Sequence, residues 1–179
     1  MMLGMRVPAL PPSAVSVKPE RSSLWPQRLA ALGAVLFIYV AACCTPSYYI
    51  VTSQGEHVTW WGFGVLLTGW TGVFVGQFAW FSNFFLLFGA IGILCRLWIT
   101  SAVMALLAVA LAMDTFTLFG KVLPADEGDV NHMQVVALGF GFYIWLASMA
   151  ALLLAALWLK MADAKARRIA LYAQFDSPP

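Results

Sequence analysis

The side chains best suited to chemistry lie in two connections between apolar runs. The connection 124–132 carries three carboxylates and a histidine, and an earlier connection adds one of each. Carboxylate oxygens and imidazole nitrogens are ligands that divalent cations accept, so these groups are candidates for an outer-loop polar cluster. The cluster consists of Glu56, His57, Asp126, Glu127, Asp129 and His132.

The spacing of these carboxylates is not that of a calcium-binding EF-hand loop, which needs acidic groups at alternate positions. The alternative interpretation is structural. Asp129 or Asn131 would cap the helix that follows, because side-chain oxygens accept bonds from free N–H groups and acidic groups suit a positive helix end. This second interpretation is favoured, so we expect no metal and no cofactor.

Three further polar residues lie within or beside apolar runs. Asn83 is expected either to form an interhelical hydrogen bond or to contact a ligand together with Gln77. Asp114 is the only acidic residue inside a predicted span, and such carboxylates are candidates for function. It lies 18 residues after Arg96, about 27 Å along a helix, which places it near one membrane surface. Its alternative role is a paired or solvated helix-end carboxylate.

Recognisable catalytic sets are absent from the sequence. There is no Ser/His/Asp set, no HExxH motif and no phosphate-binding Gly-Lys loop. The cysteines Cys43, Cys44 and Cys95 form neither a CxxC pair nor a disulfide framework. Val40 to Cys43 loosely resembles a lipoprotein processing site, but the preceding tail is long for a signal peptide. A protein that is not an enzyme is favoured.

Composition identifies the surroundings in which these residues must be held. The chain has 179 residues, of which 62% are hydrophobic and 10% charged, whereas soluble domains have about 25% charged residues. The apolar residues form long runs, which is typical of a lipid bilayer. The net charge of +2, with no basic patch interleaved with aromatics, argues against nucleic acid as a partner.

The stretch Thr59–Cys95 decides how the chain crosses the bilayer. Its 37 residues contain no Lys, Arg, Asp or Glu, which is too long for one crossing of about 20 residues and barely enough for two. With four crossings and a cytoplasmic N-terminus, nine of the ten Lys and Arg residues fall inside and only Lys121 falls outside. This split follows the positive-inside rule. We therefore predict spans at about 28–44, 76–95, 97–119 and 133–159.

The remaining segments follow from these spans. Residues 1–24 are predicted to be a disordered cytoplasmic tail and residues 161–179 a basic cytoplasmic tail. Thr59–Val75 stays on the outer side and is too apolar for water, so we expect an interfacial or re-entrant segment there. A long helix that projects outward is the alternative. Since every polar candidate lies in the outer half of the molecule, a site would lie beneath this segment.

Small residues recur at helical spacing on each predicted span. Such residues let membrane helices approach closely, so we expect a compact bundle without a pore inside one chain. The expected seams are Ser101, Ala105, Ala108, Ala112 and Thr115; Ala30, Ala34 and Ala41; Gly141, Ser148 and Ala155; and Gly72, Gly76, Ala79, Asn83 and Ala90 if the second span is continuous.

Several short patterns stand out: Gly69-Trp70-x-Gly72, Gly76-Gln77-Phe78-Ala79-Trp80 with Asn83, Pro124 to Gly128 with Asn131-His132, and Gly141-Phe142-Tyr143-x-Trp145-x-Ala147-Ser148. They resemble patterns in small, uncharacterised bacterial inner-membrane proteins with four transmembrane helices. The resemblance covers about Gly69 to Ser148. Those proteins often have Pro after the Asn, where this chain has Phe84. The resemblance implies a bacterial inner membrane and no particular activity.

Together these features predict an all-α membrane protein, a four-helix transmembrane bundle with an interfacial or re-entrant outer segment. The favoured function is that of a non-enzymatic accessory or scaffolding subunit, which packs against other membrane proteins or itself. One alternative is transport of a small solute or ion by an oligomer, using Gln77, Asn83 and Asp114. The other is an outward-facing, metal-dependent enzyme or sensor built on the outer-loop polar cluster.

Overall fold

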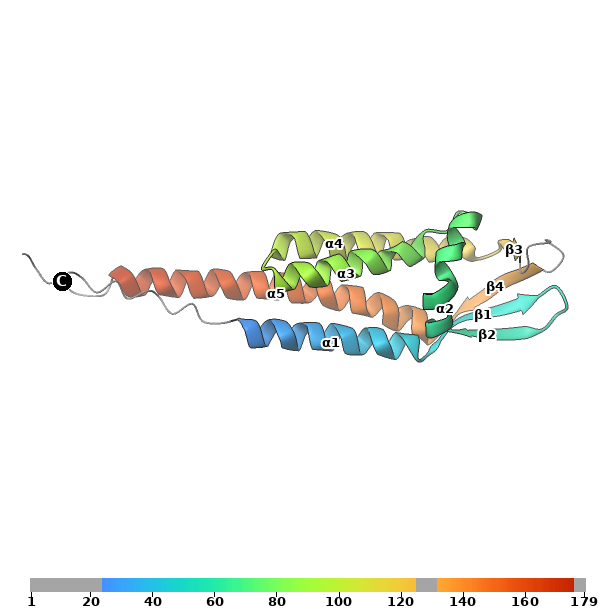
Figure 1. Cartoon of the computed structure of the whole chain (residues 1–179), viewed down its shortest axis with the longest axis horizontal. Coiled ribbons are helices and arrows are strands. Elements are labelled where there is room, and N and C mark those ends of the chain that lie inside the picture. The colour runs from blue at the N-terminus through green and yellow to red at the C-terminus, as the bar shows by residue number, and fades with distance from the viewer. Residues whose placement is uncertain (1–23, 125–131, 176–179) are drawn as a thin grey trace, which may run out of the picture.

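The computed structural model of the chain describes residues 24–124 and 132–175. Four helices lie side by side along its long axis: α1 (Trp25–Cys43), α3 (Ser82–Leu94), α4 (Trp98–Ala112) and α5 (Phe140–Phe175) (Figure 1). A short 3₁₀ turn, η2 (Ala79–Phe81), precedes α3, and another, η3 (Met113–Leu118), continues α4. A small sheet stands at one end of these helices, and α5 projects beyond the others at the opposite end.

Three helical segments of the described chain are long and apolar enough to cross a membrane. They are Trp25–Cys43, Trp98–Leu118 and Phe140–Tyr172. A crossing needs about 20 residues at 1.5 Å each. The segment Ala79–Leu94 is apolar but shorter. The prediction of a membrane protein is therefore supported by helix length as well as by composition.

A single cluster of buried side chains joins α1, α3, α4 and α5. The seam predicted on α4 is confirmed, because Ser101, Ala105, Ala108, Ala112 and Thr115 are all fully buried. The seam predicted on α1 is wrong by one position: the buried face carries Arg28, Val35 and Ala42, whereas Ala30 and Ala34 are exposed. Small side chains on α4 meet larger ones from α5, such as Met149 and Leu152, which is how close helix approach and dense packing coexist.

Contacts at the two ends of the helices show how the chain runs between them. At the end without the sheet, called the far end here, Arg28 of α1 donates to the Leu94 carbonyl of α3 at 3.2 Å. The Arg28 guanidinium also lies 5.5 Å from the Trp98 ring at the start of α4. At the sheet end, Gln77 before α3 bonds to Asp114 after α4. The chain therefore passes between the two ends four times, through α1, α3, α4 and α5.

The sheet corrects the expectation of an all-α protein. Its strands β1 (Pro46–Thr52), β2 (His57–Trp61), β3 (Val122–Pro124) and β4 (His132–Leu138) are ordered β2-β1-β4-β3, and all pairs are antiparallel. Strand β1 is rich in aromatic and β-branched residues, which favour strands. A tight turn with Gly55 at φ 80° joins β1 to β2. Ile50, Leu118 and Val135 form a second, smaller buried cluster beneath the sheet.

Two predicted spans have different bounds in the structure. The interval 133–159 begins with strand β4, and α5 starts only at Phe140 and continues to Phe175, through most of the predicted 161–179 tail. Since α5 starts at Phe140, neither Asp129 nor Asn131 can be its N-terminal cap. The interval 76–95 is not one continuous helix, because Gly76 adopts φ 74° and ends the preceding 3₁₀ segment. Gly72 and Gly76 thus do not share a helical face with Asn83.

The segment predicted at the outer surface, Thr59–Val75, combines two kinds of structure. Its first residues belong to β2. The rest forms α2 (Gly62–Thr68) and the 3₁₀ helix η1 (Gly69–Val75). We refer to Gly62–Val75 as the strap, because it lies across the sheet end of the helices (Figure 1). Phe63, Leu67 and Phe74 of the strap are exposed. An apolar, exposed surface of this kind is typical of a membrane interface.

Candidate functional site

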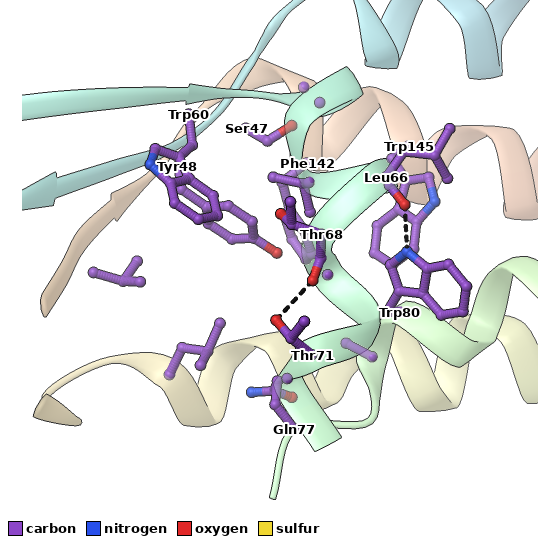
Figure 2. Close-up of a pocket in the computed structure, with 18 of the residues that line it drawn as sticks. Ser47, Tyr48, Trp60, Leu66, Thr68, Thr71, Gln77, Trp80, Phe142 and Trp145 are labelled. Atoms are coloured by element: carbon purple, nitrogen blue, oxygen red, sulfur yellow. Dashed lines mark hydrogen bonds between the residues drawn. The ribbon is translucent and has the colours of Figure 1, made fainter. Parts of the chain in front are cut away.

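A cavity of about 670 Å³ lies under the strap, between the strap, the sheet and the adjoining ends of α1, α3 and α5. Figure 2 shows the side chains that surround it. Its wall is mostly apolar and rich in aromatic rings. The rings come from Tyr39, Tyr48, Trp60, Phe74, Trp80, Phe142 and Trp145. None of the described residues that line it is a Lys, Arg, Asp, Glu or His.

Two glycines fix the strap at a small distance from the start of α3. A Cβ atom on Gly69 would lie 2.6 Å from Cδ1 of Trp80, and one on Gly72 would lie 3.2 Å from Cβ of Gln77. The Trp80 indole N–H also donates to the Leu66 carbonyl of the strap at 2.9 Å, as Figure 2 shows. A Cβ atom at Gly69 would displace the Trp80 ring and one at Gly72 would crowd Gln77, while the indole bond holds the strap in register. The pattern Gly69-Trp70-x-Gly72 followed by Gln77 and Trp80 is therefore the joint that forms the roof of the cavity.

Asp114 stabilises the backbone next to the cavity and does not line it. One carboxylate oxygen accepts a hydrogen bond from the Phe78 N–H at 2.8 Å. The Asp114 carbonyl accepts bonds from the Thr117 hydroxyl and from the Gln77 side chain. These contacts tie the start of the α3 region to the end of α4. The arrangement matches the alternative role of a paired helix-end carboxylate.

Gln77 lines the cavity, and only the nitrogen of its side-chain amide has hydrogen-bond partners. Its amide nitrogen donates to the Asp114 carbonyl at 3.2 Å and to the Thr117 hydroxyl at 3.3 Å. Its Oε1 is buried and accepts no hydrogen bond. The orientation of the amide is fixed by chemistry, because a carbonyl oxygen can only accept and must therefore face the NH₂ group. The residue as a whole is 7% exposed, so water does not compensate freely for the missing bond.

Asn83 joins three helices at the floor of the cavity. Its Oδ1 accepts bonds from the Tyr39 hydroxyl of α1 at 3.1 Å and from the Trp145 indole N–H of α5 at 2.9 Å. Its amide nitrogen donates to the Trp80 carbonyl at 2.8 Å. Asn83 thus forms interhelical hydrogen bonds, and it also borders the cavity. The sequence interpretation identified Asn83 but neither of its partners Tyr39 and Trp145.

The other polar groups around the cavity are neutral. Ser47 and Tyr48 come from β1, and Ser47 is buried while Tyr48 is partly buried. Burial raises the pKa of Tyr48 to about 12, so its hydroxyl keeps its proton at physiological pH. Tyr48 lies beside Trp60 on the sheet side of the cavity (Figure 2). The described residues that line the cavity therefore offer hydroxyl and amide groups and no charged side chain.

The described members of the outer-loop polar cluster, Glu56, His57 and His132, are not among the residues that line this cavity. Of the cluster's six members, Asp126, Glu127 and Asp129 lie outside the described residues. Glu56 and His57 lie at the turn into β2, and His132 begins β4, where its backbone bonds to Ser53. Among the described residues, no three His, Cys, Asp or Glu side chains gather as a metal site would require.

Sequence reasoning missed Tyr48, Trp60 and Phe142 as cavity residues because it missed the sheet. The aromatic and β-branched run Tyr48 to Val51, followed by Gly55 and a second run of the same kind, is a hairpin signal that could have revealed two of them. Phe142 is part of the Gly141-Phe142-Tyr143 pattern, but nothing in that pattern places it against β1.

Comparison of the chain with protein-family models, curated proteins and solved structures finds no match.

Proposed function

We propose that α1, α3, α4 with η3, and the first part of α5 each cross the membrane, with the sheet end outside. The four passes between the two ends support this arrangement, and so does the charge distribution. Arg28 and Arg96 fall at the far end, which carries most Lys and Arg, whereas Lys121 falls at the sheet end. Both termini are then cytoplasmic. Bacterial inner membrane is the location that the sequence resemblance favours.

The segment Ala79–Leu94 is the shortest of these crossings. Its 16 residues span about 24 Å, against about 30 Å of hydrocarbon. Packing against α4 and α5 shields it from lipid on one side. The apolar strap covers its sheet end, so the apolar surface continues beyond the helix itself.

Cysteine labelling tests this topology. In a chain without native cysteines, Ser53→Cys places a thiol at the sheet end and Ala164→Cys places one at the far end. We expect a membrane-impermeant maleimide to label Ser53→Cys on intact cells, and Ala164→Cys only after permeabilisation. Labelling of Ala164→Cys on intact cells would contradict the proposed orientation.

We further propose that the protein is a non-enzymatic membrane protein that binds a small, largely apolar molecule in the cavity under the strap. The observation that carries this proposal is a cavity of about 670 Å³ with aromatic walls and a few neutral polar groups. Ligand sites typically measure about 300–1,000 Å³ and have this composition. Catalysis is not favoured, because Ser47 and Cys43 have no acid or base beside them among the described lining residues.

Photo-crosslinking in nanodiscs tests ligand binding. We expect a long-chain alcohol with a diazirine on its chain to label the cavity walls, and excess unlabelled alcohol to suppress the labelling. Thr71→Trp should block it, since Thr71 lines the cavity from an exposed position on the strap. Phe63→Trp is the matched control, because Phe63 lies on the same strap and outside the cavity. Equal labelling of both variants would contradict the proposal.

The accessory or scaffolding role remains a second candidate, favoured by one observation on α1. The small residues Ala30, Gly33 and Ala34 are exposed, and a Cβ atom on Gly33 would meet nothing within 4 Å. Since small residues permit close helix approach, a partner helix or a second copy would fit there. Gly33→Leu should then shift the complex on native gels, while the exposed Leu36→Ile should not. A strictly monomeric species in native membranes would contradict this role.

A further inference from the structure

One row of side chains on the strap both lines the cavity and faces outward. Thr68, Thr71 and Phe74 border the cavity, and all three residues are exposed. Their spacing of three matches the three residues per turn of a 3₁₀ helix, so they follow one face of the strap. Figure 2 shows Thr68 and Thr71 on the same side of the strap, where the Thr71 hydroxyl donates to the Thr68 carbonyl at 2.7 Å. This row therefore forms one edge of the cavity's mouth.

The surface around this mouth is apolar. Phe74 is 80% exposed, and the exposed Trp70 packs edge-on against it, with ring centroids 6.4 Å apart. Phe63 and Leu67 of the strap are exposed as well, and the strap contains no Lys, Arg, Asp or Glu. Exposed aromatic and aliphatic side chains of this kind suit the level of the lipid head groups. Under the proposed topology, the mouth then faces the outer leaflet.

The polar atoms at the floor of the cavity already have partners or are inaccessible. Asn83 Oδ1 accepts bonds from the Tyr39 hydroxyl and the Trp145 indole. The Trp80 indole donates to a carbonyl of the strap. The Gln77 amide nitrogen is bonded, and its Oε1 is buried away from solvent. A polar group that reached this floor would have to break a bond or stay unpaired, which is costly. The end of a hydrocarbon chain needs no hydrogen bond, so the floor suits it.

The polarity of the cavity decreases from its mouth to its floor. No Lys, Arg, Asp, Glu or His is among the described residues that line it, so a charged group inside would lose its hydration and find no counter-ion. At the mouth, by contrast, the exposed Thr68 and Thr71 lie at the edge of the cavity, where a head group can stay hydrated. This difference sets the direction in which an amphiphile enters, with its chain first.

We infer that the cavity encloses one hydrocarbon chain of an outer-leaflet lipid, with the chain end near Asn83 and Trp145 and the head group outside, beside Thr68 and Thr71. This inference rests on the proposed function and names the ligand class and its orientation. Since the head group stays outside, its charge should matter little. A single-chain amphiphile and one chain of a phospholipid share this chemistry.

Three competitors of equal chain length test the inference on the unaltered protein. A long-chain alcohol, the corresponding sulfonate and the disulfonate with a charge at each end compete with the diazirine alcohol at matched mole fractions in nanodiscs. We expect the alcohol and the sulfonate to compete equally. The disulfonate should compete at least about a hundredfold less well, because one charged end would have to enter the cavity. Equal competition by the disulfonate, or none by the sulfonate, would overturn the inference.

The position of the diazirine on the probe tests the orientation. A diazirine at the chain end should label peptides that contain Asn83 or Trp145, and one beside the hydroxyl should label the strap between Thr68 and Phe74. The reverse pattern would contradict the inferred orientation. A phosphatidylcholine with the diazirine at one chain end distinguishes the sources: wall labelling by this probe identifies a two-chain lipid, and labelling only by the alcohol identifies a single-chain one.

The two proposals fail differently in these experiments. Labelling that excess alcohol suppresses, but that shows neither the competitor order nor the positional pattern, would remove the inference and leave the proposed function standing. Labelling that no competitor suppresses would remove the proposed function itself. Both experiments use the native chain, so neither depends on whether a variant folds.

Discussion

The Asn83 contact is the sharpest test of how this protein is held together. Its side chain accepts hydrogen bonds from Tyr39 on α1 and Trp145 on α5, so one residue connects three helices. Interhelical hydrogen bonds in membranes contribute about 0.6 kcal/mol on average and up to about 1.7 kcal/mol. Replacing Asn83 by Ala removes both bonds, and the bond to the Trp80 carbonyl with them, and leaves two partly buried donors unpaired. We expect Asn83→Ala to lower the free energy of unfolding by about 1–4 kcal/mol.

A double-mutant cycle isolates the hydrogen bond from the lost packing. Tyr39→Phe removes only the hydroxyl that donates to Asn83, and the cycle with Asn83→Ala measures their coupling. We expect a coupling free energy of about 0.6–1.7 kcal/mol, measured by unfolding in mixed detergent micelles. Tyr143→Phe on α5 is the control, because Tyr143 is exposed and its change should stay within about 0.5 kcal/mol. Additive effects of Tyr39→Phe and Asn83→Ala would refute the proposed role of this bond.

Three further substitutions test other contacts by the same unfolding measurement. Gly69→Ala should lower the free energy of unfolding by about 1–3 kcal/mol, because the added Cβ would meet the Trp80 ring. Gly64→Ala, with open space around it, should be neutral or stabilising. Equal effects of the two substitutions would contradict the close contact between the strap and Trp80. Arg28→Met should lower the free energy of unfolding by about 1–3 kcal/mol, because the guanidinium lies over the Trp25 ring and over the Trp98 ring and donates to the Leu94 carbonyl. An unchanged unfolding midpoint would show that these contacts are not stabilising. Ala108→Leu should lower the free energy of unfolding by about 1–3 kcal/mol, because the larger side chain disrupts the packing of the α4 seam. Leu107→Ala, at an exposed position, should not lower it. A larger loss of stability for Leu107→Ala than for Ala108→Leu would contradict this packing.

The helical part of the fold could be predicted because its causes are local in sequence. Long apolar runs define helices that lipid can surround, and the small residues on α4 mark its packing face at spacings of three and four. The position of Asp114 along the helix could also be anticipated, since its distance from Arg96 in the sequence places it at the opposite helix end. On α1 the same logic chose the wrong face. Small residues show where close approach is possible but not which neighbour uses it.

The sheet could not be predicted in full because half of its pairing is distant in sequence. The β1–β2 hairpin has a local signal, which the apolar character of its surroundings obscured. The pairing of β1 with β4, by contrast, joins residues such as Ile50 and Val135, and no short-range pattern encodes it. Strand β4 was mistaken for the start of a span, because Met133 to Leu138 is apolar enough to extend the run before α5. Apolar residues alone do not distinguish a strand end from a helix start.

The position of the cavity was easier to anticipate than its walls. The candidate polar residues lie in one half of the molecule, and the segment expected to cover them is too apolar to be surrounded by water. These two features indicated where a site would lie. Gln77 and Asn83 were identified on that basis. Tyr39, Trp60 and Trp145 were not, because an aromatic residue in a membrane protein is ordinary at the headgroup level. Their role depends on which rings the fold brings together.

The packing of the helices also bears on transport as an alternative function. Toward the far end, Ile93, Leu152 and Leu159 are fully buried in a common core, so the cavity has no continuation between the helices there. A route for solute would have to run between copies of the chain. Gln77 is buried under the strap, Asn83 is bonded to two neighbouring helices, and Asp114 holds the Phe78 backbone. Because these three residues face inward or already form hydrogen bonds, an oligomeric pathway would have to use other side chains.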